Sequence, residues 1–273
     1  MPISGARAQR ITRDALLVAT GLAFAFLAWE LAVVMPRTVA TPGAIGVDLH
    51  TYLDATRSWL AGDGFYRARQ LAGPYTIEGF GLETGAALLY PPVTLLLFLP
   101  FTALPEILWY SIPLAMFGWA IWRLRPARWS WPIIAWGLVL PMNVDVVIRG
   151  NPAIWAAAAF ALGCVTAGPA VLVLFKPSLF PFALMGANRR RWWIALAVFA
   201  LVSLPFGALW LDWARAILNS NGSLGYSLRD ALLFAIPLVA WMARAPHAPW
   251  DTASVTSPAR PQSMIATRPK PPS

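Results

Sequence analysis

Long apolar runs separated by short polar turns dominate this chain. The runs extend over residues 15–35, 90–104, 107–124, 131–148, 153–167, 170–185, 192–210 and 227–242. An α-helix rises about 1.5 Å per residue, so roughly 20 residues cross the ~30 Å hydrocarbon core of a bilayer. The pattern therefore predicts an all-α fold, a polytopic transmembrane helical bundle of about eight spanning helices with both termini in the cytoplasm.

The first apolar run follows three arginines, Arg7, Arg10 and Arg13. A basic flank before an apolar stretch also describes a secretory signal, and residues 38–40, Thr-Val-Ala, resemble a weak cleavage site. The run is longer than the apolar part of a typical signal peptide. We therefore expect an uncleaved first helix whose N-terminus lies in the cytoplasm.

Basic residues also gather at two later turns. Arginines occupy positions 189–191, and a second group consists of Arg123, Arg125 and Arg128. Cytoplasmic loops carry an excess of Lys and Arg. With eight spans, the group at 189–191 lies in the cytoplasm and obeys this rule. The group at 123–128 lies on the outer side of the membrane and breaks it. Either the runs at 90–104 and 107–124 form a re-entrant pair, or this short loop breaks the rule.

One long polar passage, about residues 37–89, interrupts the apolar pattern. We expect a transmembrane domain over 1–244 with this passage as an outer loop, and a disordered tail over 245–273, which is rich in Pro, Ser, Thr and Arg. Apolar positions between Asp48 and Leu60 fall near helical spacing, which predicts an amphipathic helix in the membrane interface. Titratable groups concentrated in one loop indicate chemistry or recognition there.

Composition excludes several classes of protein. The chain of 273 residues is 58% hydrophobic and 12% charged, with a mean hydropathy of +0.59, and is too apolar for a soluble domain. Its net charge of +9 comes from arginines beside apolar runs, so no nucleic acid partner is expected. The single Cys164 excludes an intramolecular disulfide, and no Cys/His spacing indicates a metal site. Three aspartates, Asp48, Asp54 and Asp63, could in principle hold a hard cation.

Several polar residues lie inside apolar runs. An isolated lysine at the bilayer centre costs about 3 kcal/mol on insertion scales, so Lys176 should face protein or water. It either snorkels or pairs with an acid such as Asp145, or it binds a phosphate. A second group consists of Asn143, Asp145, Arg149, Gly150 and Asn151. These residues form either an interhelical hydrogen-bonded patch or a loop at the membrane surface.

Taken singly, the signals in the outer loop are ambiguous. Asp48 could be only the N-cap of the amphipathic helix. His50 without a second ligand makes no metal site, and it is expected at the interface. The sequence Tyr90-Pro91-Pro92 could mark only a helix start, because proline is tolerated in the first turn.

The order of these features is more informative. After the first run come an Asp in an amphipathic helix, Ala-Gly-Asp-Gly-x-Tyr at 61–66, Tyr-Pro-Pro at 90–92, Gly-Asn at 150–151, Lys-Pro at 176–177, an Arg-rich turn and Asn-x-Asn-x-Ser at 219–223. This order resembles glycosyltransferase family 87, which belongs to the GT-C class of polyprenyl-phosphate-sugar-dependent transferases. The resemblance covers about Asp14 to Arg244. It is strongest at 48–66, at 90–92 with Pro100, and at 175–177.

The chain also departs from the family pattern. Gly150-Asn151 stands where the family has Gly-Gln, and Asn221-Gly222-Ser223 stands where it has Asn-Gln-Ser. The chain is shorter than family members usually are.

The resemblance implies transfer of a sugar, mannose, from a polyprenyl-phosphate donor to an acceptor hydroxyl at the outer membrane face. Asp48 would be the general base, and Lys176 would meet the phosphate, with Arg149 or Arg57 as second choices. The residues that would shape the sugar or acceptor pocket are His50, Tyr52, Tyr90, Asn151 and Asn221.

The implied partners are membrane lipid, the lipid-linked sugar donor and a glycan or glycolipid acceptor. No cofactor or metal is expected, and the protein would lie in the bacterial inner (plasma) membrane. Two alternatives stay open. The chain is a non-catalytic GT-C scaffold, or it is a small-molecule or lipid transporter whose pathway contains Lys176, Asp145 and Arg149. The absence of an internal repeat argues against transport. Convergence of Asp48 and Lys176 on one lipid-accessible cavity open to the outer leaflet would favour the transferase, whereas their separation by the thickness of a bilayer would weaken it.

Overall fold

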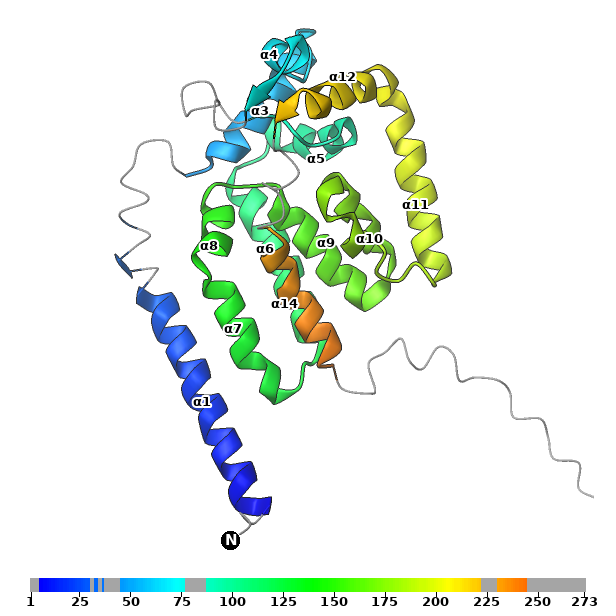
Figure 1. Cartoon of the computed structure of the whole chain (residues 1–273). Helices are drawn as coiled ribbons and strands as arrows, with labels where there is room; N and C mark the ends of the chain where they lie inside the picture. The colour runs from blue at the N-terminus through cyan, green and yellow to red at the C-terminus, as the bar shows by residue number, and fades with distance from the viewer. Residues whose placement is uncertain are drawn as a thin grey trace, which may run out of the picture.

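The described part of the chain is mostly helical, as the sequence predicts. The computed structural model describes residues 5–29, 32–33, 36, 45–76, 87–221 and 230–244, so the predicted tail lies outside the described residues. The elements, labelled as in Figure 1, are α1 (Gly5–Trp29), α3 (Val47–Ala61), α4 (Ala68–Ala72), β1 (Tyr75–Thr76), η3 (Pro92–Thr94), α5 (Leu95–Phe98), η4 (Leu99–Thr102), α6 (Ile107–Leu124), η5 (Arg128–Ser130), α7 (Trp131–Val139), α8 (Pro141–Ile148), α9 (Ala153–Thr166), η6 (Gly168–Phe175), η7 (Pro177–Leu179), α10 (Phe180–Ala183), α11 (Arg190–Ser203), η8 (Leu204–Phe206), α12 (Gly207–Leu218), β2 (Ser220–Asn221) and α14 (Ala231–Met242).

Two described stretches are long and apolar enough to cross a membrane, Ile107–Leu124 and Arg190–Leu218. A third candidate is the pair Arg128–Val139 and Pro141–Ile148, which is bent by 54°. Pro141 causes the bend, because a proline lacks a backbone N–H and keeps the residue before it out of the helical region. Leu140 accordingly has a ψ of 127°. The predicted count of about eight spanning helices is therefore not confirmed.

Several predicted spans are short or interrupted. The run at 90–104 contains only the broken helical stretch Pro92–Thr102, and α9 and α14 have 14 and 12 residues. At 1.5 Å per residue, helices of these lengths reach about 21 Å or less, short of the ~30 Å hydrocarbon core. The run at 170–185 becomes two 3₁₀ segments and the four-residue α10, because prolines interrupt it at 177 and 181.

The longest apolar stretch leaves much of its surface uncovered by protein. Along 190–218, the side chains of Leu201, Leu204 and Leu211 are 65%, 70% and 65% exposed. Soluble monomers rarely expose apolar patches of this extent. The exposure is consistent with a face that contacts lipid.

The bundle has two distinct ends (Figure 1). We call the end formed by α3, α4, β1, β2 and α12 the Asp48 end. Strands β1 and β2 pair in parallel there, with Tyr75 opposite Ser220. The Tyr75 hydroxyl also donates to the carbonyl of Ala216 at 2.7 Å, which joins α12 to the polar segment 45–76. We call the opposite end, where α6 and α14 terminate and α7 begins, the arginine end.

The path of α6 bears on the placement of the arginine group at 123–128. Helix α6 begins at the Asp48 end, where the Trp109 indole N–H donates to the carbonyl of Gly150 at 2.9 Å. It terminates at the arginine end, where Pro126 forms a β-bridge with Arg244. The N-terminal end of α1 points the same way (Figure 1). The stretch at 92–102 is shorter than a membrane span, so a single crossing by α6 would place the basic turn on the same side as the N-terminus, as the positive-inside rule favours.

Residues 168–186 fold back on themselves beside α9. A Cβ at Gly163 would lie 2.5 Å from the Ala170 Cβ, and one at Gly186 would lie 2.4 Å from the Ala167 Cβ. The two ends of the segment therefore lie together near the C-terminal end of α9. Lys176, midway along it, reaches back to the start of α9.

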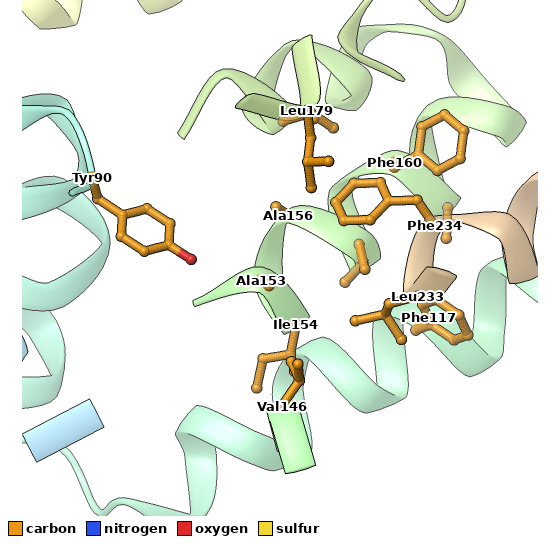
Figure 2. Close-up of a cluster of buried hydrophobic side chains, with 14 of the residues drawn as sticks. Tyr90, Phe117, Val146, Ala153, Ile154, Ala156, Phe160, Leu179, Leu233 and Phe234 are labelled. Atoms are coloured by element: carbon orange, nitrogen blue, oxygen red, sulfur yellow. The ribbon is translucent and has the colours of Figure 1, made fainter. Parts of the chain in front are cut away.

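Aromatic rings pack in the core against α3. The Tyr52 ring stacks on Phe98 with centroids 4.9 Å apart, and Phe98 stacks on Trp109 at 5.6 Å. A second cluster joins α9, α10 and α14 through Phe160, Phe182 and Phe234. Figure 2 shows part of this cluster, with the Tyr90 hydroxyl pointing toward the start of α9.

Substitution of two helix glycines tests the packing of residues 168–186 against α9. We predict that Gly163→Ala lowers the unfolding free energy of the detergent-purified chain by about 1–3 kcal/mol, because its Cβ would overlap the backbone and Cβ of Ala170. The matched control is Gly118→Ala in α6, where no atom lies within 4 Å of the added Cβ. It should be neutral or stabilise by up to about 1 kcal/mol. Equal stability of the two variants in a denaturant titration would contradict the packing.

Candidate functional site

The first turn of α3 is docked on the turn between α8 and α9. The N–H of Gly46 donates to the Ile148 carbonyl at 2.9 Å, and the N–H of Asp48 donates to the Arg149 carbonyl at 3.0 Å. Leu49 donates to the same Arg149 carbonyl at 3.3 Å. The first N–H groups of a helix have no acceptor within the helix. The turn supplies these acceptors and so fixes where the Asp48 side chain lies.

Two glycines allow this close approach. Gly46, at the N-cap of α3, and Gly150, in the turn, have φ angles of +67° and +66°. A Cβ at Gly150 would lie 2.9 Å from both the Leu49 Cβ and the Tyr110 hydroxyl oxygen. Because Gly46 is the N-cap, Asp48 is not the capping residue, so its carboxylate remains available for other contacts.

A chain of side-chain hydrogen bonds starts at Asp48. The amide nitrogen of Asn151 donates to Asp48 Oδ2 at 2.7 Å. The Tyr90 hydroxyl donates to Asn151 Oδ1 at 3.0 Å, and Lys176 Nζ donates to the Tyr90 hydroxyl at 3.2 Å. Lys176 also forms an ion pair with Asp230. Five residues from five separate segments thus form one polar network inside an apolar bundle.

The ion pair of Lys176 corrects one alternative drawn from the sequence. Lys176 and Asp230 are only 8% and 5% exposed, and they pair with each other. The predicted partner, Asp145, instead accepts from Arg149 Nε at 2.9 Å. Sequence reasoning missed Asp230. The available signal was an acid at the start of the last apolar run, since a buried lysine requires a partner.

Burial and hydrogen bonding shift the pKa of Asp48 in opposite directions. Its carboxylate is half-buried, and loss of hydration raises its pKa above the ordinary value. The hydrogen bond from Asn151 and the positive charge of Arg149 act to lower the pKa, without cancelling the effect of burial. A carboxylate with a raised pKa is a stronger proton acceptor when it is ionised.

Of the remaining predicted site residues, one is buried beside the network and three are exposed. Tyr52 is buried, with its ring edge-on to Tyr90 at 5.1 Å, so it supports the network from below. His50 is exposed and bonds Glu106 at 2.6 Å, and Arg57 is exposed and bonds Asp54 at 2.8 Å. Asn221 is exposed in β2, where its backbone pairs with Thr76. No hydrogen bond among the described residues joins His50, Arg57 or Asn221 to the network.

A second residue that sequence reasoning missed is Tyr110. Its hydroxyl lies between the two docking glycines, 2.9 Å and 3.2 Å from where a Cβ of Gly150 or Gly46 would be. The hydroxyl is buried without a hydrogen-bond partner in the described part of the chain. Nothing in the sequence distinguishes this tyrosine from the other aromatics of α6.

Two cavities flank the network. A polar cleft of about 380 Å³ lies over the turn after α3 and is lined by Asp54, Ala55, Ser58, Asp63, Gly64, Phe65, Tyr66, Arg67, Ala68 and Leu88. Tyr66 connects this cleft to the network, because its hydroxyl donates to the Tyr90 carbonyl at 2.8 Å. An apolar cavity of about 420 Å³ lies between α6, α8, α9 and α14 and reaches Ile148, next to Arg149. Across the described residues, no three His, Cys, Asp or Glu side chains form a group that could hold a metal ion.

Comparison of the chain with protein-family models, with curated proteins and with solved structures found no match.

Substitution of one partner of the buried ion pair should lower the unfolding free energy far more than substitution of both partners. We predict that Lys176→Met or Asp230→Leu alone lowers the unfolding free energy by about 3–5 kcal/mol, because each leaves a buried charge unpaired. The double variant should recover most of this loss. Denaturant titration in detergent measures all three variants. If each single variant is as stable as the unmutated chain, the pair is not buried as described.

Proposed function

We propose that this chain is a GT-C-type glycosyltransferase of the bacterial inner membrane, spanning it several times. It transfers a sugar, mannose, from a polyprenyl-phosphate donor to an acceptor hydroxyl at the outer face. The observation that carries this proposal is the network of Asp48, Asn151, Tyr90 and Lys176. The resemblance to family 87 implies these four residues at the active site, and they come from four segments of the chain. Their convergence favours a common site over separate structural roles.

Asp48 acts as the general base in this proposal. The carboxylate accepts the proton of the acceptor hydroxyl while the acceptor oxygen forms a bond to C1 of the sugar. The bond between C1 and the phosphate oxygen breaks, and polyprenyl phosphate leaves with the electron pair. One carboxylate and no enzyme nucleophile suffice for such an inverting displacement. Asn151 holds the carboxylate in place through its amide.

The contacts of Lys176 and Arg149 favour a change in which of them binds the phosphate. Lys176 is buried against Asp230 and Tyr90, so it positions Tyr90. Arg149 has a side chain that is 45% exposed and lies close enough to Asp48 to influence its charge. A guanidinium binds a phosphate through two parallel hydrogen bonds. We therefore assign the leaving phosphate to Arg149.

The two cavities fit the two substrates. The polar cleft presents the carboxylates of Asp54 and Asp63, which accept hydrogen bonds from sugar hydroxyls, and it contacts the network through Tyr66. The apolar cavity ends at Ile148, one residue before Arg149, so a donor with its phosphate at Arg149 can insert its isoprenoid chain there. In this proposal the acceptor occupies the first cleft and the donor chain occupies the second.

The direct test is sugar transfer from radiolabelled polyprenyl-phosphate-mannose in membranes that contain this chain. We predict that Asp48→Asn lowers the transfer rate by about a hundredfold or more, because the general base is lost. Asp14→Asn in α1 is the matched control, since Asp14 is exposed and lines neither cavity. Its transfer rate should be close to that of the unmutated chain.

The pH dependence gives a second readout of the same role. The base must be ionised, so the rate of the unmutated chain should fall as the pH is lowered through the raised pKa of Asp48. This acidic limb should be absent from the residual rate of Asp48→Asn. If the unmutated chain transfers no sugar to any of several acceptors while its expression is confirmed, the proposal fails and a non-catalytic scaffold is the better account.

A further inference from the structure

The apolar cavity between α6, α8, α9 and α14 contains one polar side chain. Its volume is about 420 Å³, and Asn143 is the single polar residue among the described residues that line it. The other lining residues are apolar and include Leu114, Phe117, Ile154 and Leu233. Sites for small molecules are typically cavities of about 300–1,000 Å³, mostly apolar, with a few placed polar groups. This cavity has both the size and the lining of such a site.

The break between α7 and α8 determines how the Asn143 side chain is held. Pro141 has no backbone N–H, so the carbonyl of Gly137, four residues before it, lacks its usual donor within the helix. The side-chain amide nitrogen of Asn143 donates to this carbonyl at 2.7 Å. Because a carbonyl oxygen only accepts hydrogen bonds, the bonded atom is Nδ2. The atom that remains, Oδ1, is an acceptor.

The acceptor oxygen of Asn143 is buried without a donor. Asn143 is 3% exposed, and no hydrogen bond from the described residues reaches its Oδ1. A buried acceptor that stays unpaired is unfavourable, so native structures rarely leave one. A water molecule in this cavity would find one side-chain partner, whereas a buried water is typically held by about three polar groups. A ligand that supplies a hydrogen-bond donor would satisfy the oxygen.

The lining restricts the chemistry of that ligand. An ionised group is excluded, because burial of a charge is very costly and no charged side chain among the described residues lines the cavity. An amide would bring a carbonyl oxygen that needs a donor, and the lining side chains offer none. A hydroxyl gives its single hydrogen to the acceptor and brings no further donor. An apolar molecule with one hydroxyl therefore fits best.

We propose that the apolar cavity binds a lipid alcohol, an apolar chain with one terminal hydroxyl that donates to Asn143 Oδ1. The isoprenoid chain of the sugar donor, assigned above to the same cavity, carries no hydrogen-bond donor and would leave this oxygen unpaired. The alcohol is therefore a second ligand that competes with the donor chain for the cavity. Its binding does not rest on the proposed transferase activity, because it requires only the cavity and Asn143.

The test compares farnesol with its methyl ether by isothermal titration calorimetry of the detergent-purified full-length chain. The ether keeps the chain and the oxygen but lacks the O–H. Farnesol should bind about tenfold more tightly, the gain expected from one hydrogen bond to a buried acceptor. A second pair, 1-dodecanol and its methyl ether, repeats the comparison with a straight chain, and a preference for the alcohol in either pair supports the site. Equal affinities within both pairs, or no saturable binding, would overturn the proposal.

A substitution at Asn143 tests the acceptor itself. Asn143→Leu removes Oδ1, so this variant should bind farnesol and its methyl ether with equal affinity. The loss of the hydrogen bond to Gly137 would affect both ligands alike, so the ratio of affinities reports the acceptor alone. Asn188→Leu is the control, since Asn188 is exposed and does not line the cavity, and it should keep the preference for farnesol.

A second variant tests the cavity without altering Asn143. Leu114 lines the cavity and is 48% exposed, so Leu114→Trp is tolerated at the edge and occupies part of the space. It should weaken farnesol binding by about tenfold or more. Ile112→Trp, on the same helix but outside the cavity lining, should leave the affinity unchanged. Full farnesol affinity in Leu114→Trp would refute the site.

Discussion

The seating of α3 on the carbonyl groups of residues 148 and 149 is the constraint on which the rest of the candidate site depends. Unpaired N–H groups at the start of a helix must find acceptors when they are shielded from water. Here the acceptors belong to a turn about 100 residues further along the chain. Because the turn also carries Asn151 and precedes α9, one set of backbone hydrogen bonds brings the Asp48 carboxylate to the start of a bundle helix. Glycines at 46 and 150 make the approach possible, since a side chain at either position would meet Tyr110.

A second constraint is the burial of a lysine among apolar helices. Lys176 lies between two 3₁₀ segments, where prolines prevent a continuous helix. It is satisfied by an aspartate at the start of α14 and by the hydroxyl of Tyr90. The ion pair therefore connects the folded-back segment, the last helix and the Tyr-Pro-Pro segment. Removal of either partner should loosen all three, because the charge left behind has no access to water.

The sequence predicted the helical class and a helix near Asp48, and it selected Tyr90, Asn151 and Lys176, whose side chains lie in one network. These features follow from local chemistry such as apolar periodicity, a diproline, and a lysine in an apolar run. It did not predict the partner of Lys176, because the choice between Asp145 and Asp230 depends on tertiary contacts. Its count of about eight spanning helices is not confirmed, since the described residues contain two or three candidate spans and prolines divide the runs at 90–104 and 170–185. His50, Arg57 and Asn221 were selected for their residue types, and only the fold could separate them from the network.

The central claim is that the network from Asp48 to Asp230 is a single cooperative unit. The most direct test is a double-mutant cycle between Tyr90→Phe and Asn151→Ala, with the unfolding free energy measured by denaturant titration in detergent. The two side chains are in direct contact at 3.0 Å and are contributed by segments far apart in the sequence. The account predicts a coupling energy of about 0.5–3 kcal/mol, as found for residues within one hydrogen-bond network. Additivity of the two substitutions within about 0.3 kcal/mol would contradict it.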